Sequence, residues 1–213
     1  MNTTQIKEMI FSVCSTEIKN KDELCRLDSF VGDGDHGYTV ERGFQAVRGV
    51  VTKKEYASPK AVFEDVGEVL ADSMGGAIGM IIGALFSGGA FELDDGPEID
   101  TKGFAVFFTA GLEEIKLTGG AKEGDRTLVD ALSPAVSAFT AAQKAGEDMK
   151  ACFLEAAEAA RKGAESTKNM AAKKGRAKFL QEKSLGYIDA GSVTMSIMIE
   201  AMKEYVECME EAV

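Results

Sequence analysis

The chain has 213 residues, of which 45% are hydrophobic and 28% are charged, so its composition is that of a folded globular protein. The length suits one compact domain and no Ser/Pro-rich linker divides it, so we expect residues 1–213 to form a single domain. The 35 acidic and 24 basic residues give a net charge of -11, which argues against nucleic acid or an anionic membrane as a partner. An acidic chain that handles phosphates needs metal cations or a few well-placed bases.

Four cysteines lie far apart without a C-x-x-C pair, and His36 is the only histidine. This scatter argues against a structural zinc site and indicates buried thiols in a reducing compartment. The N-terminus has no basic region followed by an apolar run, so we expect no signal peptide and a cytoplasmic protein.

The first half of the chain is predicted to be helical, because apolar residues recur at the spacing of one helix face. One such stripe runs from Ile6 to Val13 and another from Val62 to Leu70. The segment 31–37 between them is rich in glycine and aspartate, which indicates a loop.

The segment Met74 to Phe91 has no charge over 18 residues, which is long enough for a membrane span. Six of these residues are glycine, however, and Asp72 and Glu92 bound the segment without a basic flank. We therefore predict a buried helix of a soluble protein, in which the glycines let another backbone or a ligand approach closely.

The second half follows the same helical pattern. Ala105 to Phe108 fits a short buried strand or a helix equally well, and a stripe from Leu128 to Phe139 contains Pro134, which predicts a kink. Residues 135–164 are rich in alanine, the best helix former. A final stripe runs from Val193 to Tyr205.

Clear period-two alternation is absent, so the sequence predicts an all-α protein. We expect the methionines at helical spacing in the final stripe to be core residues; they are Met195, Met198 and Met202. Loops at one end of a helical bundle can gather into one site. The predicted breaks are 31–37, 94–100, 118–125 and 186–191.

The most informative loop places Asp28, Asp33 and Asp35 within eight residues, with glycines at 32, 34 and 37. Carboxylates about 5 Å apart repel each other by roughly 3 kcal/mol per pair at an effective dielectric constant near 20. Such a cluster either points apart into water, as a solvated acidic turn, or binds cations. Ligands that are all oxygen suit Mg²⁺, which is commonly shared between carboxylates and nucleotide phosphates.

Three known phosphate or metal motifs fit this loop poorly. The string GDGDHG matches G-x-G-x-x-G, but its aspartates would repel a pyrophosphate and no βαβ pattern surrounds it. An EF-hand loop starting at Asp33 would need glutamate at its twelfth position, where Phe44 stands. A Walker A loop needs a Gly-Lys pair, and the chain has none.

The loop D-x4-D-x-D-H-G resembles the metal loop of the L subunit of dihydroxyacetone kinase, a module that also forms the nucleotide domain of single-chain, ATP-dependent dihydroxyacetone kinases. The resemblance covers about the whole chain, in order and with little change in length. Further segments that resemble this family are Arg42–Phe44, Ser73–Gly79, Ala121–Thr127 with Asp130, Lys174–Gly186 and Asp189–Gly191.

The resemblance implies an all-α barrel of eight antiparallel helices, with an adenine nucleotide, ADP or ATP, capping one end. It also implies two Mg²⁺ ions between the aspartates and the phosphates. In systems coupled to the sugar phosphotransferase pathway, ADP stays bound and is rephosphorylated by a phospho-histidine protein. ATP then passes its γ-phosphoryl group to dihydroxyacetone, which is held on a separate K subunit.

Carried over residue by residue, the resemblance makes Asp28, Asp33 and Asp35 the metal ligands and Arg176 the catalytic residue that neutralises charge on the transferring phosphoryl group. The nucleotide contacts that it implies are His36, Gly37, Tyr38, Thr39, Ala77, Ile78, Gly119, Leu128, Arg176, Asp189, Ala190 and Gly191.

Plainer interpretations stand beside these roles. His36 is the only possible phospho-histidine carrier, but a histidine in a polar loop is more often a hydrogen-bonding group, and we expect that role here. Taken alone, Arg176 would be a surface base and Asp189 a helix cap; within the matched segments we expect both in the site.

The chain departs from the family at three positions: Ile78 replaces a common serine, Tyr187 a histidine and Ala190 a proline. These departures leave the acceptor open, and a kinase subunit for another acceptor, such as a four-carbon ketose, remains an alternative. A further alternative is a nucleotide-dependent binding module that regulates a partner, such as a transcription factor.

Overall fold

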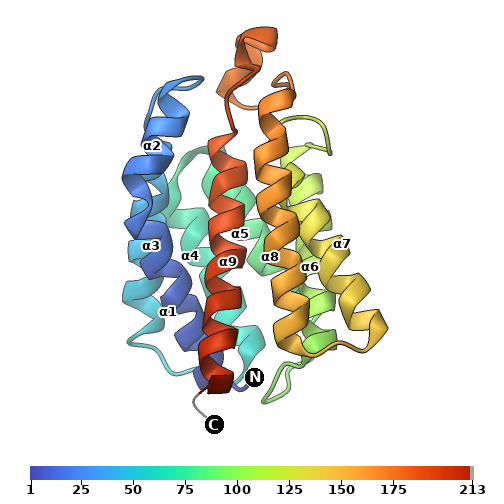
Figure 1. Ribbon diagram of the computed structural model, residues 1–213. Helices are drawn as coiled ribbons and strands as arrows, with labels where there is room; N and C mark the ends of the chain where they lie inside the picture. Colours follow the sequence, from blue (N-terminus) through green and yellow to red (C-terminus); the bar gives the residue numbers. More distant parts are fainter. Residues whose placement is uncertain (212–213) are drawn as a thin grey trace.

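The structure is a computed structural model that describes residues 1–211, and within that range it is built from helices without a β-strand (Figure 1). The α-helices are α1 (Thr3–Lys19), α2 (Lys21–Ser29), α3 (His36–Val51), α4 (Pro59–Met74), α5 (Gly76–Phe91), α6 (Thr101–Gly119), α7 (Val129–Ala145), α8 (Met149–Ser166) and α9 (Ala190–Glu211). Three short 3-10 helices lie between α8 and α9: η1 (Thr167–Asn169), η2 (Arg176–Phe179) and η3 (Gln181–Ser184).

Eight of the helices close into a ring. Each of α3 to α9 packs on the helix before it in the order α1, α3, α4, α5, α6, α7, α8, α9, and α9 packs back on α1. The short α2 follows α1 after the single residue Asn20 and packs on α3 and α9 at one end of the ring, the upper end in Figure 1. The predicted all-α barrel of eight helices is therefore confirmed, with α2 as an addition.

Local signals in the sequence explain where several helices begin and end. Ser58 caps α4 by accepting a hydrogen bond from the Ala61 amide, and Pro59 occupies the first helical position, where its missing N–H costs nothing. Helix α6 ends at Gly120, which adopts the left-handed conformation with a φ of 58°.

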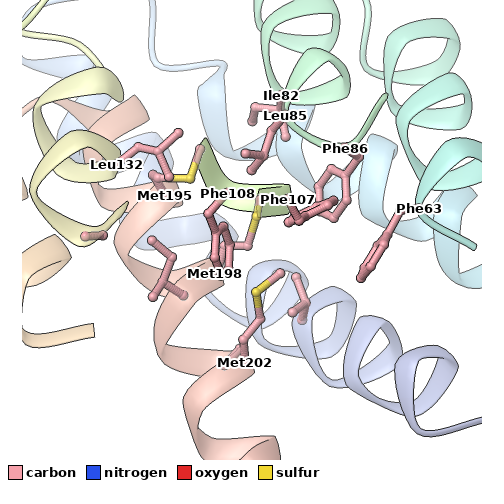
Figure 2. Close-up of a cluster of buried hydrophobic side chains, with 14 of the residues drawn as sticks. Phe63, Ile82, Leu85, Phe86, Phe107, Phe108, Leu132, Met195, Met198 and Met202 are labelled. Atoms are coloured by element: carbon pink, nitrogen blue, oxygen red, sulfur yellow. The ribbon is translucent and has the colours of Figure 1, made fainter. Parts of the chain in front are cut away.

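The core fills the inside of the ring with aromatic and methionine side chains (Figure 2). The ring centroids of Phe63 and Phe107 lie 4.4 Å apart, so the side chains of α4 and α6 are in direct contact. The methionines of α9 predicted for the core are fully buried in it; they are Met195, Met198 and Met202.

The structure decides between the alternatives left by two segments. Ala105 to Phe108, which also fitted a strand, lies within α6. In the uncharged segment Met74 to Phe91, Met74 ends α4, and the residues from Gly76 onward form α5, which packs between α4 and α6. Among residues 1–211, no helix combines the length and the apolar character that crossing a membrane requires.

Glycine allows α4 and α5 to cross closely, as the sequence predicted for the glycine-rich segment. A Cβ atom on Gly67 would lie 2.8 Å from the Ser87 amide nitrogen and 2.9 Å from the Gly83 carbonyl oxygen. A Cβ atom on Gly83 would lie 2.7 Å from the Gly67 carbonyl oxygen. The two backbones therefore touch at a point where neither residue has room for a side chain.

We expect Gly67→Ala to lower the free energy of unfolding by about 1–3 kcal/mol, because the added methyl group meets backbone atoms that cannot move aside. The matched control is Gly49→Ala in α3, where nothing lies within 4 Å of the added Cβ. That control should raise the free energy of unfolding by up to about 1 kcal/mol through helix propensity. Denaturant unfolding measures both, and a stabilising Gly67→Ala would contradict the close crossing.

One acidic residue lies inside the ring away from the predicted site. Glu17 of α1 is fully buried, and neither of its carboxyl oxygens has a hydrogen-bond partner within the described part of the chain. Burial raises the pKa of Glu17 well above its usual value of 4.5, because water can no longer stabilise the charged form.

A group whose pKa is higher in the folded than in the unfolded chain contributes stability at low pH. That contribution falls as the pH rises above the pKa of the group in the unfolded chain. We therefore expect Glu17→Gln to gain stability relative to the wild type as the pH rises from 4.5, by up to about 1.4 kcal/mol per pH unit. The control is Glu64→Gln at an exposed position of α4. Urea unfolding at several pH values tests this, and curves for Glu17→Gln that stay parallel to the wild type would refute it.

Candidate functional site

The three predicted aspartates converge at the upper end of the barrel. Asp28 lies in the last turn of α2, and Asp33 and Asp35 lie in the connection to α3. One carboxylate oxygen from each residue can be chosen so that all three lie within 4.8 Å of one another. This convergence fits a hard cation, since such ions prefer several carboxylate oxygens and no sulfur or nitrogen ligand is needed.

The glycines of the loop make this convergence possible. The Gly34 amide donates a 2.8 Å hydrogen bond to Asp28 Oδ2, and Gly34 reaches this position with a φ of 75°, which favours glycine. A Cβ atom on Gly32 would lie 2.2 Å from Asp28 Oδ1. The loop therefore wraps around the Asp28 carboxylate, with no room for a side chain at Gly32 and a backbone conformation at Gly34 that favours glycine.

Arg176, from η2, offsets part of the negative charge. Its Nη1 atom contacts Asp33 Oδ1 and donates a 3.1 Å hydrogen bond to Asp35 Oδ1. The hydrogen bond to Asp35, together with the charges of both aspartates, raises the pKa of the Arg176 guanidinium. The Arg176 side chain is 65% exposed, so it lies at the rim and can reach a bound group.

His36 is the first residue of α3 and is fixed by α9. Its Nε2 atom lies 2.8 Å from Thr194 Oγ1, and Thr194 also contacts the Ala190 carbonyl oxygen at 3.2 Å. Burial lowers the pKa of His36, against the opposing charges of Asp28 and Asp35. The imidazole is thus a neutral hydrogen-bonding group near pH 7.

A pocket of about 630 Å³ opens beside this cluster. Its wall comes from the acidic loop, the start of α5, the connection between α6 and α7, the segment 174–177 and the start of α9. Twelve of the predicted site residues line it: Asp28, Asp35, His36, Thr39, Ala77, Ile78, Gly119, Leu128, Arg176, Asp189, Ala190 and Gly191.

Three predicted residues lie outside the wall of the pocket. Asp33 is held beside it through Arg176. Gly37 is buried against α2, where a Cβ atom would lie 2.0 Å from the Lys21 carbonyl oxygen, so only glycine fits at this position. Tyr38 is 60% exposed, and its ring lies beneath the Lys21 ammonium group at 5.5 Å.

The pocket has a polar and an apolar part. Gly75 and Gly76 both have positive φ values and break the chain between α4 and α5, and α5 begins without a side-chain cap. The free N–H groups of such a helix start suit an anion. Apolar side chains on the wall suit a flat base; they include Ile78, Ile81, Ile115 and Leu128.

Sequence reasoning gave no role to three basic residues of this wall: Arg42, Arg126 and Lys174. Arg42 donates a 2.9 Å hydrogen bond to the Ser73 carbonyl oxygen and so holds the end of α4. Arg126 is only 1% exposed. The one signal in the sequence for a role of Arg126 in the site was its place in the segment Ala121–Thr127, because the burial of an arginine is not visible in a sequence.

The comparisons with known proteins identify the family of this chain. The family model of the DAK2 domain matches residues 30–204. The ADP-binding subunit DhaL of the PEP-dependent dihydroxyacetone kinase 1 of Listeria innocua is 34% identical over 184 residues, which are 86% of this chain and 87% of that protein. The L-erythrulose kinase of Pectobacterium atrosepticum is 34% identical over 87% of this chain, but the match covers only 32% of that longer protein.

A solved structure shares the fold. The dihydroxyacetone kinase from C. freundii, in complex with AMP-PNP and Mg²⁺, superposes with a TM-score of 0.74 and 27% sequence identity. The match covers 96% of this chain and 34% of that one. With the family model covering most of its length, this chain belongs to the DAK2 domain family.

Proposed function

We propose that this chain is the nucleotide-binding subunit of a hydroxyketone kinase of the dihydroxyacetone kinase type, and that residues 1–213 form one such domain. ADP or ATP is held with two Mg²⁺ ions in the pocket at the upper end of the barrel. The γ-phosphoryl group passes to a ketone on a separate K-type subunit. The observation that carries this proposal is the convergence of three carboxylates beside a pocket with a polar and an apolar part.

The residues present fit a metal-bound nucleotide. Asp28, Asp33 and Asp35 would hold the cations, which would neutralise charge on the phosphates when bound. A nucleoside triphosphate carries about four negative charges, and this chain adds a net charge of -11, so the protein alone would repel the ligand. Arg176 is the one base in contact with the cluster in the described chain, and its planar fork of donors suits a phosphoryl oxygen.

The rest of the pocket would orient the nucleotide. Free N–H groups at the start of α5 face the phosphates, and the apolar wall receives the base. His36 serves as a hydrogen-bonding group, with its Nε2 atom held by α9, and the phosphoryl group passes through the bound nucleotide in this scheme. The proposed contacts are His36, Gly37, Tyr38, Thr39, Ala77, Ile78, Gly119, Leu128, Arg176, Asp189, Ala190 and Gly191.

Two routes could recharge the bound nucleotide. A phospho-histidine protein of the phosphotransferase system could rephosphorylate ADP in place, as the name of the PEP-dependent relative suggests for that protein. Alternatively, ADP could exchange with free ATP. A cytoplasmic location is supported by the four free cysteines, Cys14, Cys25, Cys152 and Cys208.

A four-carbon ketose is a second candidate acceptor, because relatives at 34% identity include L-erythrulose kinases. In the two-subunit scheme the acceptor is bound outside this chain. The identity of the K-type partner would then decide between the two ketones.

We expect nucleotide binding to require Mg²⁺. Calorimetry should detect Mg-ADP binding and no binding of ADP in excess chelator, because the carboxylates and phosphates repel each other without the cation. Asp33→Asn should weaken Mg-ADP at least about tenfold, in line with the loss of one contact to a charged group. The control Asp94→Asn removes the same charge at an exposed site between α5 and α6 and should change affinity less than about twofold. Tight binding in chelator would refute the cation bridge.

We expect the isolated chain not to phosphorylate dihydroxyacetone. Adding a K-type subunit with ATP, or with a phospho-histidine donor and its energy source, should start turnover, since the chain then has a partner that holds the ketone. A coupled assay with dihydroxyacetone and L-erythrulose as parallel substrates measures this. Turnover by the chain alone would overturn the two-subunit scheme.

A further inference from the structure

Arg126 is a buried cation at the base of the pocket. It lies in the connection between α6 and α7 and has a positive φ of 61°, which is unusual for a residue with a side chain. Two carboxylates hold this connection in shape. Asp130 accepts hydrogen bonds from the amides of Gly124 at 2.5 Å and Thr127 at 2.8 Å, and Asp125 accepts one from the Lys122 amide at 3.1 Å. These hydrogen bonds hold the connection in a conformation that directs the Arg126 side chain into the protein interior.

The guanidinium uses only part of its hydrogen-bonding capacity. Nη2 donates a 2.9 Å hydrogen bond to the Tyr187 carbonyl oxygen, and Nη1 lies 3.6 Å from Asp189 Oδ1, too far for a good hydrogen bond. Within the described residues, Nε and Nη1 find no hydrogen-bond acceptor. A buried donor without a partner is costly, so a purely structural arginine should be better paired than this.

Asp189 is the group that Arg126 faces. Its Oδ2 atom accepts a 2.8 Å hydrogen bond from the Ser192 amide at the start of α9, while Oδ1 is directed to Arg126. The side chain is 19% exposed and lines the pocket. Burial raises the pKa of Asp189 to about 6, the charge of Arg126 opposes this, and the charges of Asp130 and Asp28 add to it.

Resting on the proposed function, we propose that Arg126 is a positioning residue that holds Asp189 Oδ1 as an acceptor for an O–H or N–H donor of the nucleoside part of the ligand. A carboxylate accepts hydrogen bonds only and repels phosphates. The donors that a nucleotide offers are its ribose hydroxyls and the amino group of its base. Arg126 itself does not touch the phosphates in this scheme.

Calorimetry with Mg-ADP, Mg-2′-deoxy-ADP, Mg-3′-deoxy-ADP and Mg-IDP tests this on the full chain. We expect the wild type to bind one of the three analogues about tenfold more weakly than ADP, which identifies the donor. Asp189→Asn and Arg126→Met should each weaken Mg-ADP about tenfold and erase the discrimination against that analogue. The double variant should be no weaker than the weaker single variant, because both act on one contact.

Controls separate positioning from structure. Arg126→Lys keeps a cation beside Asp189 and should restore part of the discrimination. Arg161→Met removes a charge from an exposed position of α8 and should leave all four affinities within about twofold. Thermal unfolding shows whether Arg126→Met is folded; if it is not, Arg126→Lys and Asp189→Asn are compared instead.

Three results would overturn the proposal. Arg126 variants that weaken all four ligands equally and keep the wild-type discrimination would show a structural role. Arg126 variants that weaken the binding of ADP but leave the binding of AMP unchanged would show contact with a phosphate. A wild type that discriminates against none of the analogues would leave Asp189 without a donor. Failure of the wild type to bind Mg-ADP at all would instead refute the proposed function, and this inference with it.

Discussion

Mutual repulsion among Asp28, Asp33 and Asp35 is the constraint on which the upper end of this barrel depends. Carboxylates this close cost roughly 3 kcal/mol per pair at an effective dielectric constant near 20, unless a cation shares them. The chain brings Arg176 to two of them from more than 140 residues away. The segment between α8 and α9 therefore lies across the end of the barrel, and the pocket has a wall on that side.

The barrel is held rigid by helix packing, and the connections and helix starts at its upper end carry the polar groups of the pocket. The aromatic core and the close crossing at Gly67 and Gly83 fix the helices relative to one another. Because five connections or helix starts meet at one end, small polar groups from distant parts of the sequence reach one pocket. His36 and Thr194 show this, since His36 begins α3, Thr194 lies near the start of α9, and their side chains meet at 2.8 Å.

Local patterns in the sequence indicated most of the helices and the acidic loop, because both depend on residues close together in the chain. The break at Asn20, which separates α2 from α1, contains neither glycine nor proline and was not predicted. The burial of Arg126 depends on a positive φ and on contacts with Tyr187 and Asp189, which become its neighbours only in the fold. The packing of Gly37 against α2 was likewise not visible in the sequence. Spacing alone cannot show which side of a first helical turn faces a pocket.

The three departures from the family differ in what they change. The Tyr187 side chain stacks on Phe30 at 5.1 Å, outside the pocket wall, and contributes to the site through its carbonyl oxygen, which any residue there would offer to Arg126. Ala190 is the first residue of α9, a position where proline and alanine are both accepted because the amide needs no helical partner. Ile78 alone changes the chemistry of the wall, since it replaces a hydroxyl with an apolar surface near the start of α5. Under the proposed function, the free amides of that helix start would hold the ligand there without help from a side chain.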